Sequence, residues 1–208
     1  MASAALLTIA FASRAALDAW LAKHHATSEG VWLKLAKKSA RVPSVSYAEA
    51  VAVALCWGWI DGQKQALDDD WWLQKLTPRS ARSPWSKINC DKATALIADG
   101  KMRAAGLAEV ERAKRDGRWD AAYDSPSNSK VPDDLRAALA DNARAAAFFA
   151  TIDATNRYAI LWRIQTAKKP ETRARRVAEL VALLARGELL HPPRRAPRTG
   201  AGRANRSR

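Results

Sequence analysis

Cysteine, glycine and long apolar runs are all scarce in this chain, and each scarcity excludes a class of protein. The 208 residues include two cysteines, Cys56 and Cys90, neither in a C-x-x-C motif, so a disulfide framework or a zinc knuckle is unsupported. We expect both to be small buried hydrophobic residues. Nine glycines without a repeat exclude a collagen-like chain. No apolar stretch approaches the ~18 residues of a membrane-spanning helix, so we expect a cytoplasmic protein with no membrane span.

The short signatures of the common enzyme classes are also missing. There is no Walker loop, no G-x-G-x-x-G, no G-x-S-x-G and no H-E-x-x-H. The histidines His24, His25 and His191 are not spaced as metal ligands, and the acidic run Asp68–Asp70 is typical of a solvated turn. We therefore predict no catalytic residue, no metal and no cofactor.

Positive charge is abundant. Lys and Arg number 35 against 21 Asp and Glu, a formal net charge of +14, and six of the arginines lie in residues 191–208, which leaves +8 on residues 1–190. The segment 191–208 contains Pro, Gly and Arg and little that is apolar, so we predict a disordered Arg-rich tail. Such a tail can contact nucleic acid non-specifically by counterion release, or it can serve only as a solubilising extension.

Apolar residues make up 48% of the chain, which is enough for a packed core. The patterning predicts an α+β fold: a small antiparallel sheet from about 31–37, 57–66 and 71–77, with covering helices, followed by a helical C-terminal region. We predict one domain over 1–190, with an α+β part at about 1–82 and a helical part at about 83–190.

Several shorter features support these boundaries. Leu6–Phe11 is predicted to be a short strand before the first helix. Ser13 and Ser86 are suited to cap helices, and Ser46 with Glu49 three residues later forms a capping-box pattern.

Four segments are distinctive, and they occur in a fixed order: Gly58–Gly62 (GWIDG), Thr77–Arg79 (TPR), Ser83–Asn89 (SPWSKIN) and Ala167–Arg173 (AKKPETR). Together they resemble the YdeI/OmpD-associated family, also called the bacteriocin-protection family, over roughly residues 11–187. The resemblance implies protection against bacteriocins or association with an outer-membrane protein. It implies no reaction, cofactor or catalytic residue.

The same segments supply a candidate ligand-binding site. Free N–H groups at a helix that begins at Ser86 could bind an anion together with nearby basic side chains, or the helix could simply cap itself. In this hypothesis, three basic residues provide charge, three polar residues provide hydrogen bonds, Trp85 forms a wall and Asp61 orients an arginine. The basic residues are Arg79, Lys168 and Arg173, and the polar residues are Ser83, Ser86 and Asn89.

Asp61 and the tryptophans each admit two interpretations. Asp61 is either a general base or a carboxylate paired with Arg79, and we favour the pair because buried charges are usually paired. Five tryptophans occur between residues 57 and 85. Exposed indoles among basic residues can stack on nucleobases, but we favour a core role. The neighbours Trp71 and Trp72 must point to opposite faces of a strand, so one of them could be exposed.

We therefore expect a non-enzymatic binding protein for an unknown protein partner or a small anionic ligand. One alternative is a nucleic-acid-binding protein that uses its basic surface and the tail. Another is an enzyme acting on a small anionic metabolite, with Asp61 as its base.

Overall fold

The computed structural model describes residues 5–126 and 128–191, and the chain divides into two compact units, with the division between Ser125 and Pro126. The predicted tail at 191–208 lies outside the described residues except for His191. The sheet ends before residue 83 and only helices follow, as expected. The first two of these helices, however, belong to the first unit and not to a separate helical part. The prediction that residues 1–190 form one domain stays a prediction.

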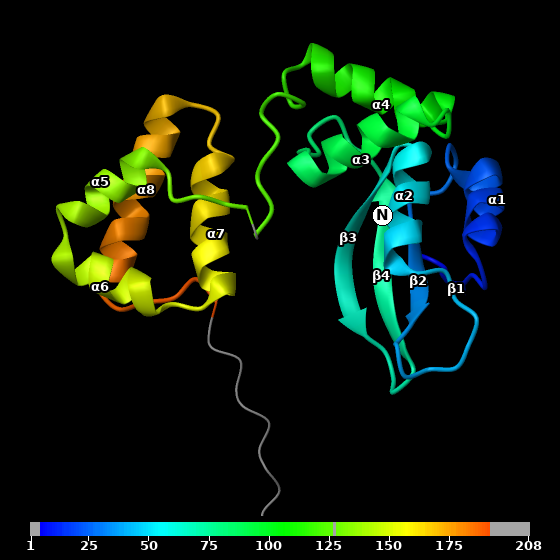
Figure 1. The fold of residues 1–208 in the computed structure, drawn as a ribbon, viewed down its shortest axis with the longest axis horizontal. Coiled ribbons are helices and arrows are strands. Elements are labelled where there is room, and N and C mark those ends of the chain that lie inside the picture. Colours follow the sequence, from blue (N-terminus) through cyan, green and yellow to red (C-terminus); the bar gives the residue numbers. More distant parts are fainter. Residues whose placement is uncertain (1–4, 127, 192–208) are drawn as a thin grey trace, which may run out of the picture. The chain divides into compact units, whose positions relative to one another are not determined.

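The first unit is built on a four-stranded sheet in the order β1-β2-β4-β3 (Figure 1). Its strands are β1 (Thr8–Ala10), β2 (Val31–Ala36), β3 (Trp59–Ala66) and β4 (Trp71–Pro78). The predicted α+β class is confirmed. The sheet is mixed rather than purely antiparallel, because β1 pairs parallel to β2 while β2, β4 and β3 pair antiparallel. A helix between β1 and β2 returns the chain to the same end of the sheet, as a parallel pair requires.

Four helices belong to this unit: α1 (Arg14–His24), α2 (Tyr47–Cys56), α3 (Lys87–Ala98) and α4 (Ala104–Arg115). The predicted caps are present. Ser13 accepts from the Ala16 amide, Ser46 and Glu49 form a reciprocal capping box, and Ser86 begins α3. Local sequence chemistry therefore determines where three of the four helices begin.

The strand predicted to start at residue 57 starts at Trp59. Trp57 ends α2, and its indole Nε1 donates to Asp18 Oδ1 at 2.8 Å. Gly58 follows with φ +73, where a side chain would be strained, and a Cβ there would lie 2.9 Å from the Ala105 carbonyl oxygen. The sharp turn therefore separates the helix from the strand and brings the start of β3 close to α4.

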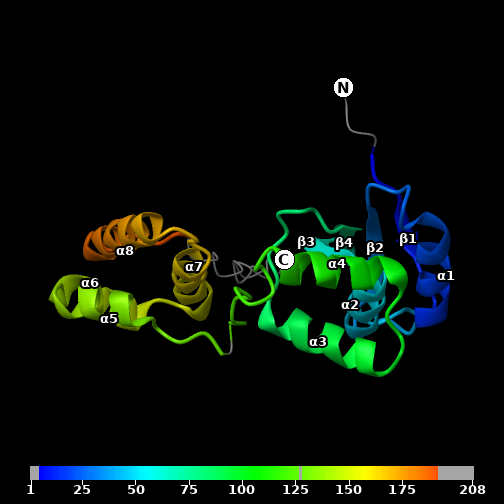
Figure 2. The same cartoon turned by 90° about the horizontal axis from the view of Figure 1, so that it is seen from above.

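The core of the first unit lies between one sheet face and the helices. Alternate residues of β2, namely Val31, Leu33 and Leu35, are buried against Leu17 and Leu21 of α1. Figure 2 shows α2 and α3 on one side of the sheet. The period-two alternation of β2 thus determines which face is covered.

A second cluster joins α2 to α3 and α4. It includes the free cysteines Cys56 and Cys90, both buried as predicted. At Gly106 a Cβ would lie 2.6 Å from the Leu55 carbonyl oxygen and closer still to that of Cys56. Only glycine allows α4 to approach α2 this closely, and the approach places the middle of α4 beside the end of β4.

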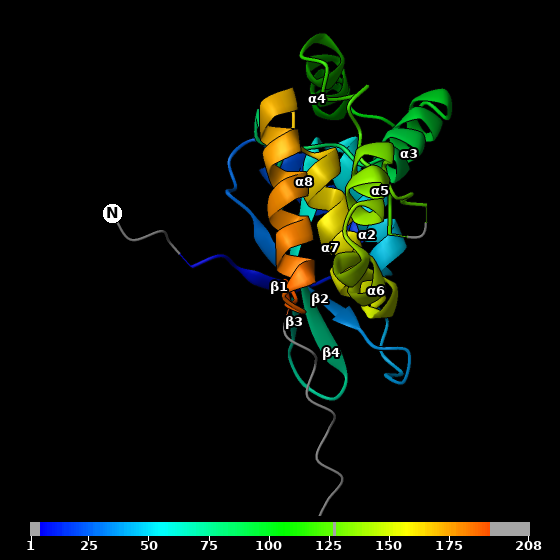
Figure 3. The ribbon, with the colours of Figure 1, turned by 90° about the vertical axis from the view of Figure 1, so that its left-hand side faces the viewer.

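The second unit is helical. Its elements are α5 (Asp133–Ala140), α6 (Ala143–Thr151), α7 (Ala154–Gln165) and α8 (Pro170–Ala185). Apolar residues of all four helices form its core, and α8 contacts each of the other three (Figure 3). Across the described part of the chain, none of the helices combines the length and the apolar character needed to cross a bilayer.

Candidate functional site

Arg79 is a buried arginine directly after β4. Its backbone N–H donates to the Gly58 carbonyl at 3.0 Å, which fixes the chain at the end of β3 and β4. The residue is 5% exposed, and its guanidinium lies 3.7 Å from the ring centroid of Trp85, which is itself 2% exposed. Arg79 and Trp85, both predicted site residues, are therefore in direct contact.

The guanidinium of Arg79 is only partly hydrogen-bonded. Nη1 donates to the Pro84 carbonyl at 3.4 Å, whereas Nε and Nη2 are buried with no partner among the described residues. Burial lowers the pKa of Arg79 to about 10, and nearby acids, Glu109 foremost, act in the opposite direction. With a pKa near 10 the side chain still carries its charge at neutral pH. A buried charge without a paired anion is costly, because desolvation of one ion costs several kcal/mol.

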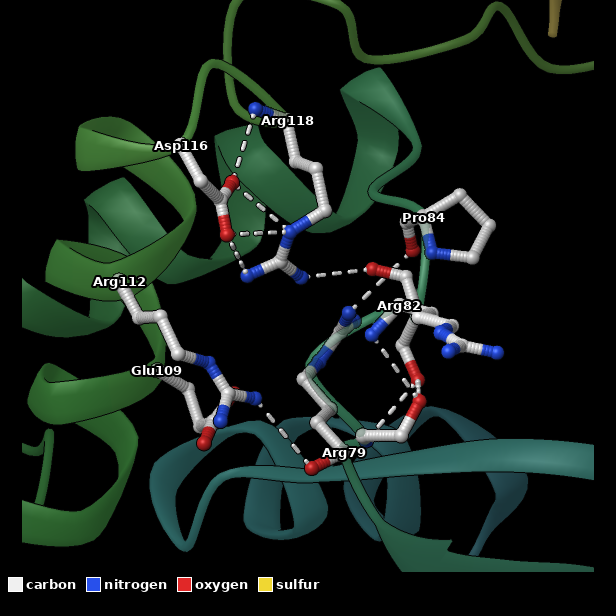
Figure 4. A network of polar contacts seen from close by, with 9 residues as sticks. Arg79, Arg82, Pro84, Glu109, Arg112, Asp116 and Arg118 are labelled. Carbon is white, nitrogen blue, oxygen red and sulfur yellow. Dashed lines mark hydrogen bonds and ion pairs between the residues drawn. The ribbon is translucent and has the colours of Figure 1, made fainter.

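Arg118 lies in the same network and, unlike Arg79, has a carboxylate beside its guanidinium (Figure 4). It is also 5% exposed, and its Nη1 donates to the Ser83 carbonyl at 2.8 Å. Its Nε donates to Asp116 at 2.8 Å, and its Nη2 lies 2.7 Å from Asp116 Oδ2. Asp116 thus lies on the Nε and Nη2 edge of Arg118, bonded through Nε and at ion-pair distance from Nη2, although Nη2 itself makes no well-aligned hydrogen bond; the same edge of Arg79 holds no described group.

Arg112 of α4 is the third guanidinium of the network. It pairs with Glu109 and donates to the Arg79 carbonyl at 3.4 Å, while its Nε is buried without a described partner. Nε1 of Trp85 is also buried without a described hydrogen-bond partner. All the unsatisfied atoms around Arg79 are therefore donors, and the three guanidiniums face two carboxylates, those of Glu109 and Asp116. Such a set is suited to an anion with several acceptor oxygens.

The predicted serines lie next to this network but already have partners. Ser83 and Ser80 hydrogen-bond through their hydroxyls at 3.0 Å and close the turn that carries the exposed Arg82. The Ser86 hydroxyl accepts from the Asn89 amide at 3.2 Å, so this helix end caps itself. The local sequence thus builds a turn and a cap around Arg79, and the unsatisfied donors are those of arginine and tryptophan.

Asp61 lies on β3 and accepts a hydrogen bond from the Tyr47 hydroxyl at 2.6 Å. Burial raises the pKa of Tyr47, and this hydrogen bond acts in the same direction. Burial also raises the pKa of Tyr123, with Asp61 acting in the same direction and Arg79 against it. Within the described residues, the hydrogen bond of Asp61 goes to Tyr47 rather than to Arg79, so the expected orienting contact is not formed.

The remaining predicted residues belong to the second unit. Lys168 is exposed between α7 and α8. Arg173 donates to Asp134 through Nε at 2.6 Å and Nη2 at 3.0 Å, and through Nη1 to the Ile164 carbonyl at 3.2 Å. This repeats the contact pattern of Arg118. That Lys168 and Arg173 join the Arg79 site stays a prediction.

Four members of the network were missed by sequence reasoning: Glu109, Arg112, Asp116 and Arg118. The first two lie on a helix whose sequence is typical of an ordinary amphipathic helix, and the last two flank a glycine turn. The only sequence signal for this network was that Arg112 and Arg118 each follow an acidic residue by two or three positions, and that pattern is common on solvated helices. In the described residues no three His, Cys, Asp or Glu side chains are grouped as metal ligands would be.

Comparisons with known proteins match two separate parts of the chain, one in each of its two compact units. Residues 128–187 match the family model described as bacteriocin-protection, YdeI or OmpD-associated. Residues 9–109 match a domain of unknown function, DUF8412. Of the four distinctive segments, only Ala167–Arg173 lies inside the first match, so that match is narrower than the expected 11–187. No curated protein and no solved structure shows a significant match to the chain.

Proposed function

We propose a binding function for this chain rather than a catalytic one, because the family model that residues 128–187 match, described as bacteriocin-protection, YdeI or OmpD-associated, names no reaction. The protein captures an anionic group, a carboxylate or a phosphate, on the Nε and Nη2 edge of Arg79. The group belongs to a small ligand or to a partner protein. The cytoplasmic location expected from the sequence is part of the same proposal.

One observation carries this proposal: Nε and Nη2 of Arg79 are buried and unsatisfied. This edge of a guanidinium matches the two oxygens of a carboxylate or phosphate. In the same chain Arg118 and Arg173 both use it to hold an aspartate. An anion bound to Arg79 would form a third ion pair of this kind and offset the cost of the buried charge.

The ligand reaches Arg79 through the turn at residues 80–84. In the present conformation both nitrogen atoms are covered. The turn is closed by neutral hydrogen bonds among Ser80, Arg82 and Ser83, each contributing only about 1 kcal/mol, and by the Arg118 bond to the Ser83 carbonyl. Arg82 is exposed on this turn and offers a first contact for an incoming anion. The turn opens, and charge-assisted bonds from the anion to Arg79 offset the neutral hydrogen bonds that are lost.

Calorimetric titration of the full chain with inorganic phosphate and with acetate tests the proposal. Arg79→Lys keeps the positive charge but cannot form the bidentate pair of hydrogen bonds, so we expect the affinity for the preferred anion to fall at least about tenfold. Because a chain with net charge +14 binds anions weakly at many places, a matched control is needed. Arg186→Lys removes an equivalent edge that Glu188 already occupies, at a position outside the candidate site, and should leave anion binding unchanged. Equal heats for the wild type and Arg79→Lys would refute the proposal.

A further inference from the structure

The sheet of the first unit has a second face that the core does not use. On β2 the residues that alternate with the buried ones are Trp32, Lys34 and Ala36, and all three are partly exposed. The strand register places Lys75 opposite Trp32, and Trp71 opposite Ala36. These residues therefore share the face turned away from α2.

Each tryptophan on this face is paired with a lysine. The ammonium of Lys34 lies 4.8 Å from the ring centroid of Trp71, and that of Lys75 lies 5.9 Å from the ring centroid of Trp32. The outward positions of the strands carry no acidic side chain. Those positions are Thr8 and Ala10 on β1, Trp32, Lys34 and Ala36 on β2, Ile60 and Gln65 on β3, and Trp71, Leu73, Lys75 and Thr77 on β4.

We propose that this face, called here the Trp–Lys face and defined by Trp32, Lys34, Trp71 and Lys75, binds single-stranded nucleic acid. Its charge is complementary to phosphates, and its indoles are complementary to bases. A surface cation–π pair contributes about 0.5–1 kcal/mol, whereas stacking of a base on an aromatic side chain contributes about 1–3 kcal/mol. A base can therefore replace a lysine on its indole, and the released ammonium then binds the neighbouring phosphate.

The geometry also sets the length of the nucleic acid. Trp32 and Trp71 lie on adjacent strands, four register positions apart. Four steps of about 3.3 Å along the strand, combined with a spacing of about 4.8 Å between the strands, put their Cα atoms about 14 Å apart. One nucleotide cannot stack on both indoles, so a strand of several nucleotides is needed to use the whole face.

The test is fluorescence titration of the full chain with a single-stranded oligonucleotide of about twelve nucleotides at several salt concentrations. Lys34→Gln combined with Lys75→Gln should reduce the slope of log affinity against log salt by about 1.4, since each lost phosphate contact removes about 0.7. Lys23→Gln combined with Lys130→Gln removes the same charge from exposed positions elsewhere and should change the slope by much less.

The indoles are tested separately from the charge. Trp71→Leu should weaken binding about tenfold and Trp71→Phe much less, because phenylalanine keeps a ring for stacking. Circular dichroism verifies that both variants are folded. The proposal is overturned if the oligonucleotide does not bind, or if the two lysine pairs have equal effects. It is also overturned if polyglutamate competes as well as nucleic acid, because the face would then belong to acidic proteins.

Discussion

Arg79 and Arg118 present the same guanidinium edge in opposite states of pairing. Both side chains are 5% exposed, and both donate Nη1 to a backbone carbonyl of the Ser83–Pro84 segment. Arg118 holds Asp116 on its Nε and Nη2 edge, and Arg79 holds no described group there. The two residues therefore make a matched pair for experiment.

Replacing each arginine with methionine should have unequal effects on stability. Arg118→Met removes charge-assisted hydrogen bonds and should cost about 2 kcal/mol. Arg79→Met loses its stacking on Trp85 but also removes an unpaired buried charge, so its cost should be within about 1 kcal/mol. Urea unfolding followed by tryptophan fluorescence measures both, since eight of the nine tryptophans precede residue 126. A larger loss for Arg79→Met than for Arg118→Met would contradict the assignment.

Gly106→Ala should destabilise the first unit by about 1–3 kcal/mol, because the added methyl group would meet backbone carbonyl oxygens of α2 rather than a movable side chain. Gly100→Ala is the comparison. Gly100 has φ +65, and a Cβ added there would meet nothing within 4 Å, so only backbone strain of about 1 kcal/mol is expected. Similar losses at both positions would contradict the close approach of α4 to α2.

The pair of Asp134 and Arg173 should make the second unit less stable in acid. The hydrogen bond from Arg173 is the main cause that lowers the pKa of Asp134. A lowered pKa in the folded state means that the pair contributes stability above the unfolded pKa, and that this stability is lost as the pH falls through the folded pKa. Both side chains are about one-third exposed, so solvent screening keeps the effect below about 1 kcal/mol.

Unfolding by circular dichroism, compared between the wild type and Asp134→Asn, measures this contribution. The stability difference should be present at neutral pH and should vanish in acid, once Asp134 is protonated in the folded chain. A difference that is constant over this range would exclude the pair as its source.

Both cysteines should be unreactive in the folded protein. Burial raises the pKa of the Cys90 thiol to about 11 and also raises that of Cys56. At a pH of about 8 the reactive thiolate of Cys90 is then a fraction of about one in a thousand. We expect modification by an aromatic disulfide reagent to be at least about 100-fold slower than in urea. Rapid modification of the native chain would show that these helices open readily.

Much of the local structure could be predicted from sequence, and the reasons are local. The helix caps at Ser13, Ser46 and Ser86 depend on contacts three residues apart, which a sequence pattern contains. The strand predicted over 57–66 is present but begins at Trp59, because tertiary packing, seen in the bond from Trp57 to Asp18, favours a helix end at Trp57 over the strand preference of tryptophan.

The candidate site was only partly predictable. Arg79 and Trp85 were selected from one segment of chain, and they do lie in contact. Arg118 is far from them in sequence, and its bond to the Ser83 carbonyl spans 35 positions, which no local pattern contains. The parallel pairing of β1 with β2 was missed for the same reason. Long-range contacts decide which charges find partners.

Anion capture by Arg79 can be observed directly by nuclear magnetic resonance of the arginine Nε–H groups in the full chain during titration with inorganic phosphate and acetate. The Arg79 resonance is assigned by its loss in Arg79→Lys, and that of Arg118 by its loss in Arg118→Lys. We predict that the Arg79 signal shifts downfield and saturates with the preferred anion, because its Nε–H gains an acceptor. The Arg118 signal, already bonded to Asp116, should stay in place. An unmoved Arg79 signal, or equal small shifts of both signals, would contradict the account.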